Sequence, residues 1–153
     1  MRPPDLLQFN GNWDVYEHEL YRVFIDELAR SGLEFRGKKI ACRRIPETGG
    51  RWASFWHLVQ QGHAEDERTP DLRRCERLRW IRWVIQNAGK HPEIDEWRNT
   101  RTNETNTLLW YREEYLVVLA QRQNSWLLKT AYCTDQHRRI EQLSSFRIVR
   151  KVK

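Results

Sequence analysis

The chain has 153 residues, of which 27 are Lys or Arg and 21 are Asp or Glu, and its formal charge is +6. Hydrophobic residues make up 39% of the sequence and include eight Trp, which is enough to fill a core and excludes a chain that is disordered throughout. No apolar run approaches the roughly 18 residues of a membrane span, and the first residues lack the apolar stretch of a signal peptide. We therefore expect a cytoplasmic protein without a membrane partner.

The charge is distributed unevenly along the chain. Residues 1–30 hold three Arg and six acidic residues, a net charge of −3, and the rest of the chain therefore carries +9. A basic surface suits a polyanion, and nucleic acid is the commonest such partner of a cytoplasmic protein. Solubility alone is the alternative explanation of this charge.

The first half of the chain predicts helices with one short strand between them. Residues 13–30 form a helix, because Asn12 is a suitable N-cap and apolar residues recur every three or four positions. Residues 38–44 read as a short strand, and the two glycines in residues 46–50 mark a loop.

A strand-like apolar run over residues 54–59 is followed by a basic helix. Thr69 as N-cap and Pro70 at the first helical position begin this helix, which ends near Asn87. Its outward faces are rich in arginine: Arg73, Arg74, Arg77, Arg79 and Arg82.

From Trp97 onward, an alternating pattern predicts strands over residues 106–112, 115–121 and 126–132. Strict alternation places one set of side chains of the last strand on a single face: Trp126, Leu128, Thr130 and Tyr132. A last helix begins near residue 134.

The expected fold class is α+β: N-terminal helices packed on a three- to five-stranded antiparallel β-meander, with a short helix near the C-terminus. The length favours a single domain over residues 1–153. We divide it into a helical part (about 1–37), a core (about 38–143) and a basic tail (144–153).

Several kinds of site find no support in the sequence. The His and Cys residues lack metal-ligand spacing, and no Glu-x-Lys step of a magnesium nuclease is present, so we expect no metal. No nucleophile elbow or glycine-rich phosphate loop occurs, and no cofactor is expected. The three cysteines cannot all pair, and reduced thiols are expected.

What remains is metal-free chemistry on RNA. RNA carries its own nucleophile, the 2′-OH, so an enzyme needs a base, an acid and cations that hold the phosphate. His57 precedes a polar loop, although it also fits a core histidine. Thr130 and Tyr132 share a strand face and His137 follows them, although ordinary strand and surface positions explain them as well.

The residues of the second half resemble a known family. Residues 115–122, a turn, residues 126–132 and a helix that opens with His137 and Arg138 resemble the phage-associated branch of the barnase–EndoU–colicin–RelE-like ribonuclease superfamily. The Phe-Trp-His-Leu step at residues 55–58 and the Asp-Leu-Arg-Arg-Cys-Glu-Arg helix at 71–77 add to this resemblance.

The resemblance implies a toxin-like endoribonuclease, or an effector of a phage or mobile element. It would cleave RNA without a metal and leave a 2′,3′-cyclic phosphate. It implies that His57 is a general base or acid, that Arg74 or its neighbour Arg73 holds the phosphate, and that His137 is the second acid or base. Thr130 and Tyr132 would line the scissile site.

Two other functions compete with this one. A non-catalytic nucleic-acid-binding module of the same fold would use Arg73, Arg77 and Arg138 on the backbone and Trp52 for base stacking. A protein-interaction or phage structural domain is the third. For a toxin, an antitoxin or immunity protein is the expected partner besides RNA, and the acidic N-terminal helix is its expected docking site or a cover of the basic face.

Overall fold

The computed structural model describes residues 1–61, 69–101 and 103–134. Its helices are α1 (Trp13–Phe24), the π-helical η1 (Ile25–Ala29), α2 (Ala53–Val59), α3 (Leu72–Glu76) and α4 (Leu78–Asn87). Its strands are β1 (Glu34–Phe35), β2 (Lys38–Ala41), β3 (Gln60–Gln61), β4 (Thr69–Pro70), β5 (Ile94–Arg101), β6 (Glu104–Tyr111), β7 (Tyr115–Gln121) and β8 (Ser125–Cys133). No helix in these described ranges is long and apolar enough to cross a membrane.

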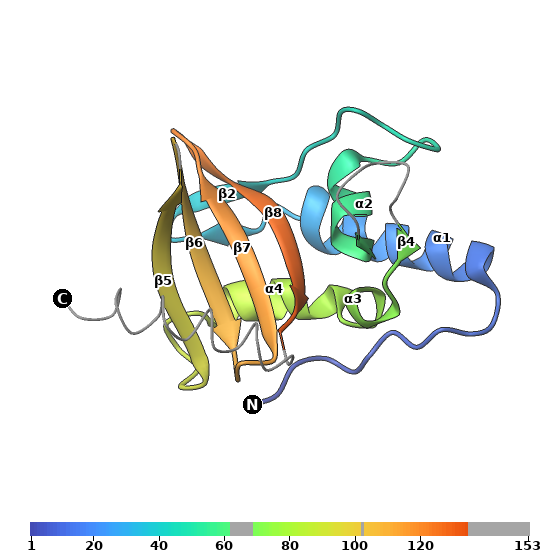
Figure 1. The fold of residues 1–153 in the computed structure, drawn as a ribbon, viewed down its shortest axis with the longest axis horizontal. Helices are drawn as coiled ribbons and strands as arrows, with labels where there is room; N and C mark the ends of the chain where they lie inside the picture. The colour runs from blue at the N-terminus through green and yellow to red at the C-terminus, as the bar shows by residue number, and fades with distance from the viewer. Residues whose placement is uncertain (62–68, 102, 135–153) are drawn as a thin grey trace.

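The main sheet has six strands in the order β1-β2-β8-β7-β6-β5 (Figure 1). All neighbours are antiparallel except β2 and β8, which run parallel. The meander of β5 to β8 confirms the expected α+β class. The limit of five strands is wrong, because β1 and β2 extend the sheet beyond β8. The expected C-terminal helix lies outside the described residues.

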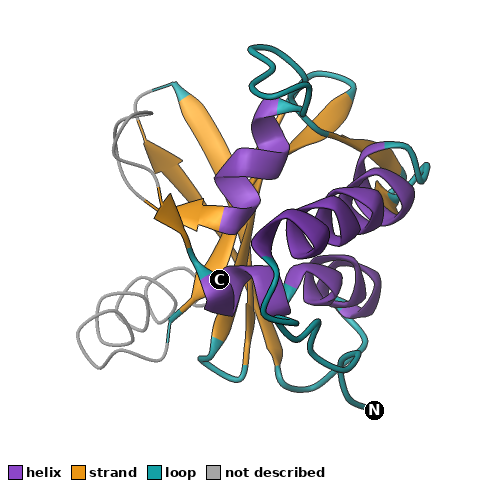
Figure 2. Cartoon of the chain, turned by 90° about the vertical axis from the view of Figure 1, so that its right-hand side faces the viewer, coloured by secondary structure: helices purple, strands orange, loops and turns teal. Residues whose placement is uncertain are grey.

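The helices gather on one side of the sheet (Figure 2). The main core forms between them and includes Tyr16 and Phe24 of α1, Phe55 of α2 and Ile81 of α4, all of them fully buried. A second apolar cluster forms on the opposite face from Trp97, Leu108, Trp110, Leu116 and Val118. Residues of β6 and β7 are therefore buried on both faces, which explains their continuous apolar runs.

The first predicted helix is confirmed as α1 followed by η1. The side chain of Asn12 accepts a hydrogen bond from the Val15 amide at 3.2 Å, as an N-cap should. The predicted strand at residues 38–44 exists as the shorter β2.

The predicted strand over residues 54–59 is wrong, because this run is the helix α2. Short apolar runs carry no clear period, and tertiary packing decides between helix and strand. In α2, Phe55, Leu58 and Val59 lie three to four positions apart and enter the main core together.

The predicted basic helix has a different start and is broken in two. Thr69 and Pro70 form β4, which pairs with β3, and Asp71 is the N-cap of α3. Arg77, at φ −104° and ψ 17°, leaves the helical region and separates α3 from α4.

The predicted alternation along the last strand fails at a β-bulge. Val118 pairs with Thr130 while Leu119 pairs with Leu128, so Lys129 is an extra residue in β8. The bulge moves the side chains that follow it to the other face of the sheet. Thr130 and Tyr132 still share a face with each other, but no longer with Trp126 and Leu128.

Candidate functional site

The last turn of α2 places His57 between two neighbouring cavities. The smaller cavity has a volume of about 120 Å³, and Arg43 and Lys129 lie in its wall together with His57. The larger cavity has a volume of about 210 Å³ and shares Arg43 and His57 with the smaller one. His57 is half-buried, and Arg43 is exposed.

Arg43 is held at this place by the start of α2. Its backbone amide donates to the Ser54 hydroxyl at 2.5 Å, and the Ser54 amide donates to the Arg43 carbonyl at 2.9 Å. The chain that leaves β2 is thereby fixed to the helix that carries His57. The two cavity residues come from segments 14 positions apart, yet their backbones share one rigid connection.

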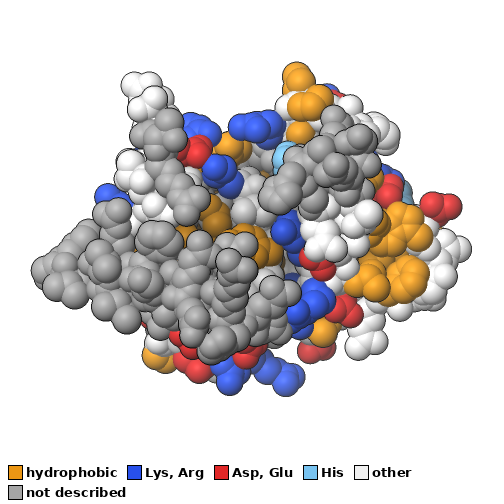
Figure 3. Space-filling view, viewed as in Figure 1, with side chains coloured by type: hydrophobic (Ala, Val, Ile, Leu, Met, Phe, Trp, Pro, Cys, Tyr) orange, Lys and Arg blue, Asp and Glu red, His pale blue; other side chains and the backbone are white. Residues whose placement is uncertain are grey.

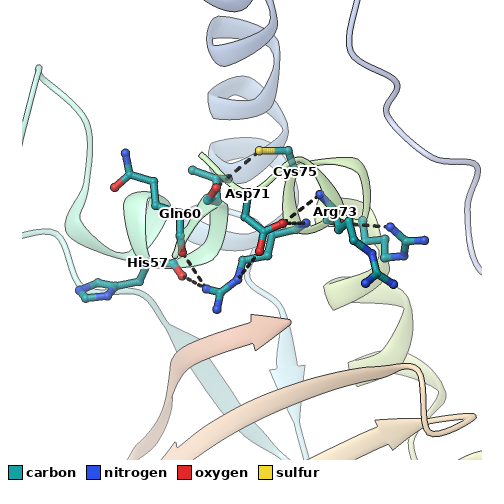
Figure 4. Close-up of polar contacts among 8 residues, drawn as sticks. His57, Gln60, Asp71, Arg73 and Cys75 are labelled. Carbon is teal, nitrogen blue, oxygen red and sulfur yellow. Dashed lines mark hydrogen bonds and ion pairs between the residues drawn. The ribbon is translucent and has the colours of Figure 1, made fainter. Parts of the chain in front are cut away.

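Arg74 holds the other end of α2 (Figure 4). Its Nη1 donates to the carbonyl of His57 at 3.1 Å and to that of Gln60 at 2.8 Å. These contacts satisfy carbonyls at a helix C-terminus, where a cation is favoured. The guanidinium also pairs with Asp71, with Nε 3.4 Å from Oδ2, and lies over the Tyr132 ring at 5.5 Å.

Asp71 positions Arg74 in turn. Its Oδ1 accepts from the amides of Arg73 at 3.0 Å and Arg74 at 3.3 Å, which caps α3 (Figure 4). In the same view the imidazole of His57 points away from Asp71, so the ring faces the cavities and the backbone faces Arg74.

The strand β8 supplies the other wall of the smaller cavity. Lys129, the extra residue of the bulge, lies there, and its Nζ donates to Glu104 Oε2 at 2.6 Å. Lys129, and more weakly Arg122, hold the pKa of Glu104 below its usual value. The carboxylate therefore stays charged and keeps Lys129 at the sheet.

Cationic side chains gather on one face of the molecule. Figure 3 shows Lys and Arg side chains around an apolar area in the middle of one face, with a His side chain beside them. Buried thiols lie nearby but are poorly suited to attack, because burial raises the pKa of Cys42 and of Cys75 to about 12. None of the three cysteines, all of which lie in the described residues, forms a disulfide.

The structure brings part of the predicted site together. The Arg74 guanidinium contacts the backbone carbonyl of His57 and the ring of Tyr132, while the His57 imidazole faces the cavities. Thr130 shares the sheet face of Tyr132. Arg73 is exposed on α3 beside them. His137 and Arg138 lie outside the described residues.

Two predicted nucleic-acid contacts lie away from the cavities. The guanidinium of Arg77 lies over the Trp80 ring at 5.1 Å. Trp52 packs edge-on against Phe24, and the guanidinium groups of Arg30 and Arg44 lie 5.8 Å and 5.9 Å from its ring. Trp52 is thus a half-buried ring with two arginines near it, and it lines neither cavity beside His57.

Four residues of the cavity walls were not predicted from the sequence as site residues: Arg43, Trp56, Gln60 and Lys129. The basic end of the predicted strand at residues 38–44 was a signal for Arg43. Lys129 was placed on the wrong face relative to the site because a bulge leaves no clear mark in an alternating pattern.

Comparisons with protein-family models, with curated proteins and with solved structures find no match to this chain. Among the described residues, no three His, Cys, Asp or Glu side chains are grouped so that they could hold a metal ion.

Proposed function

We propose that this protein is a metal-independent endoribonuclease whose acid–base residue is His57. The observation that carries the proposal is the smaller cavity, where the His57 ring shares a wall with two cationic side chains, Arg43 and Lys129. An imidazole changes its charge near neutral pH, and cations stabilise the negative charge that a phosphate gains in the transition state.

The reaction would proceed by attack of the RNA 2′-oxygen. A base removes the 2′-OH proton, the 2′-oxygen forms a bond to phosphorus, and the bond to the 5′-oxygen breaks. An acid protonates the departing 5′-oxygen, and a 2′,3′-cyclic phosphate remains. His57 serves as one of these two groups, and His137 keeps its predicted role as the other.

The phosphate contact is assigned differently from the sequence prediction. Arg74 lines neither cavity, and its Nη1 is engaged by two backbone carbonyls. Arg43 and Lys129 lie in the wall of the smaller cavity, where Lys129 also pairs with Glu104. We therefore assign the phosphate to Arg43 and Lys129. Thr130 and Tyr132 line the path of the RNA on the adjoining sheet face, and Arg73 contacts its backbone.

The biological role belongs to the same proposal. The chain would act in the cytoplasm as a toxin-like or phage-encoded effector, and an antitoxin or immunity protein would control it. The resemblance of its residues to the ribonuclease superfamily supports this role.

Incubation of the purified protein with total RNA and with single-stranded DNA, each with and without EDTA, tests the proposal. RNA cleavage should persist in EDTA, spare DNA, and fall by about 100-fold or more in His57→Ala, since acid–base groups contribute that much. His18→Ala, which removes an exposed histidine of α1, is the matched control and should cleave normally.

Two results would contradict the enzyme. Equal cleavage by His57→Ala and by the wild type would show that His57 is not the acid–base residue. Loss of cleavage in EDTA would show that the reaction needs a metal ion. Salt-dependent RNA binding without any cleavage would show that the protein is a nucleic-acid-binding module and that the same cations bind the RNA backbone.

A further inference from the structure

The larger cavity beside His57 has a volume that suits a small ligand. Its volume is about 210 Å³. Pockets that hold drug-sized molecules usually have about 300–1,000 Å³, so this cavity suits one ring system rather than a whole nucleotide.

The wall of this cavity combines an aromatic ring with groups that form hydrogen bonds. Trp56 and Pro46 supply apolar surface, and Gln60 and Thr48 supply polar atoms. A Gln amide offers donors and an acceptor side by side, which is the pattern that the edge of a nucleobase requires. A tryptophan ring stacks on any base.

The Trp56 ring is held in place before any ligand arrives, and Gln60 is fixed through its backbone. The indole Nε1 of Trp56 donates to the Thr48 carbonyl at 3.0 Å, and its ring meets Phe55 edge-on at 5.0 Å. The backbone of Gln60 is fixed by the hydrogen bond from Arg74 at 2.8 Å. The indole of Trp56, which is already fixed, therefore loses little entropy on binding.

The loop over the cavity needs its glycines. Gly49 has φ +59°, and a Cβ built on it would meet the Trp56 ring at 4.0 Å. The backbone at Gly49 therefore lies beside the indole of Trp56, and the neighbouring Thr48 lines the cavity.

The larger cavity lies next to the smaller one. Arg43 and His57 belong to the walls of both cavities. When a phosphate is held in the smaller cavity, the base of the attached nucleoside can therefore reach the larger cavity. We propose that the larger cavity is a nucleobase subsite, in which Trp56 stacks on the base beside the scissile phosphate and Gln60 selects it by hydrogen bonds. This inference rests on the proposed RNA substrate.

Equilibrium titration with the four nucleoside 3′-monophosphates and with ribose 3-phosphate, followed by NMR, tests the subsite without any need for cleavage. The wild type should bind one nucleotide best and ribose phosphate least. Gln60→Ala should reduce the preference among bases about tenfold, the effect of one lost hydrogen-bonding group. Gln86→Ala, at an exposed position of α4, should bind as the wild type does.

Trp56 is tested by two substitutions, because it also supports the loop. Trp56→Ala should lower the affinity for all four nucleotides about tenfold or more. Trp56→Phe should retain most of the affinity because it keeps a ring for stacking. Equal loss in both variants would assign Trp56 to the loop alone and overturn its stacking role.

The possible outcomes distinguish failure of the proposed base subsite from failure of the proposed ribonuclease activity. RNA cleavage together with equal binding of all nucleotides and of ribose phosphate overturns the subsite and leaves the ribonuclease intact. Base-dependent binding that is lost in Gln60→Ala, without RNA cleavage, supports the subsite and overturns the enzyme. Absence of mononucleotide binding overturns the subsite as well.

Discussion

At the scale of single residues, Arg74 connects more of the site than any residue considered above. Its guanidinium joins two carbonyls at the end of α2, the carboxylate that caps α3, and the ring of Tyr132 on β8. Its side chain is only 18% exposed, so these contacts are largely shielded from water. Hydrogen bonds from a charged donor in such a place are worth more than exposed ones.

Arg74→Ala should lower the free energy of unfolding by about 2–3 kcal/mol, because the carbonyls of His57 and Gln60 lose a charged donor. Urea denaturation measures this difference. Arg98→Ala, at an exposed position of β5, is the control and should change stability by less than about 0.5 kcal/mol. Similar losses in both variants would show that the Arg74 contacts add nothing to the fold.

Asp71 allows a finer test at the same scale. Asp71→Ala removes the acceptor of the Arg73 and Arg74 amides and should destabilise the protein by about 1–2 kcal/mol. Asp71→Asn keeps an oxygen in this position and should retain most of the cap. A full loss of stability in Asp71→Asn would indicate that the ion pair with Arg74, rather than the cap, is the main contribution.

At the scale of elements, the bulge in β8 decides what faces the cavity. The bulge inserts Lys129 between Leu128 and Thr130, and Glu104 at the start of β6 then binds the Lys129 ammonium. Arg122, just after β7, pairs with the same carboxylate at 3.2 Å. Three strands are thereby joined by one acidic residue.

This cluster predicts a pH dependence of stability. Lys129 and Arg122 lower the pKa of Glu104 in the folded state from its ordinary 4.5. The stabilisation is therefore present above pH 4.5 and is lost as the pH falls through the lower, folded-state pKa. Because all three side chains are about a third exposed, the effect at neutral pH stays below about 1 kcal/mol.

Glu104→Gln should accordingly be slightly less stable than the wild type at pH 7, and the two should converge in strong acid. Thermal denaturation across the pH range measures the difference, and added salt should reduce it. A difference that stays constant with pH would mean that the charge of Glu104 is not its source.

At the scale of the whole molecule, one core holds the N-terminal helix and the sheet together. Buried residues from Leu7 to Ala131 belong to the same cluster. The acidic residues of the N-terminal helices pair in part with arginines of the same molecule: Glu17 with Arg51 at 3.0 Å, and Glu27 with Arg79 at 3.1 Å. The helix α1 is thus an integral part of the fold, and an antitoxin that docks there would meet only its outer face.

The shared core predicts a single unfolding transition. Leu20 of α1 is fully buried, so Leu20→Ala should destabilise the protein by about 2–5 kcal/mol. The loss of stability should be the same whether unfolding is followed by circular dichroism or by tryptophan fluorescence. Val15→Ala, at a position that is 53% exposed, should change stability little. Two separate transitions would show that α1 unfolds independently.

The sequence predicted the elements whose signals are local. Asn12 caps α1 as expected, and the strands over residues 115–121 and 126–132 lie in β7 and β8. The strand prediction for the run around His57 is wrong, because a short apolar run fits either structure until packing decides. The strand β5 was missed, since its charged residues hide the alternation.

By itself, the sequence determined the α+β class and the basic balance of the chain, which follow from composition and from the period of its apolar residues. The choice of His57, Arg74 and Tyr132 as candidate site residues came from side-chain chemistry and from the resemblance, and it stays a prediction. Only the tertiary structure decided that β2 runs parallel to β8, that Lys129 enters the cavity wall, and that Arg74 binds the end of α2. Such contacts join residues far apart in the chain, and the pairing of strands that creates them leaves no periodic trace in the sequence.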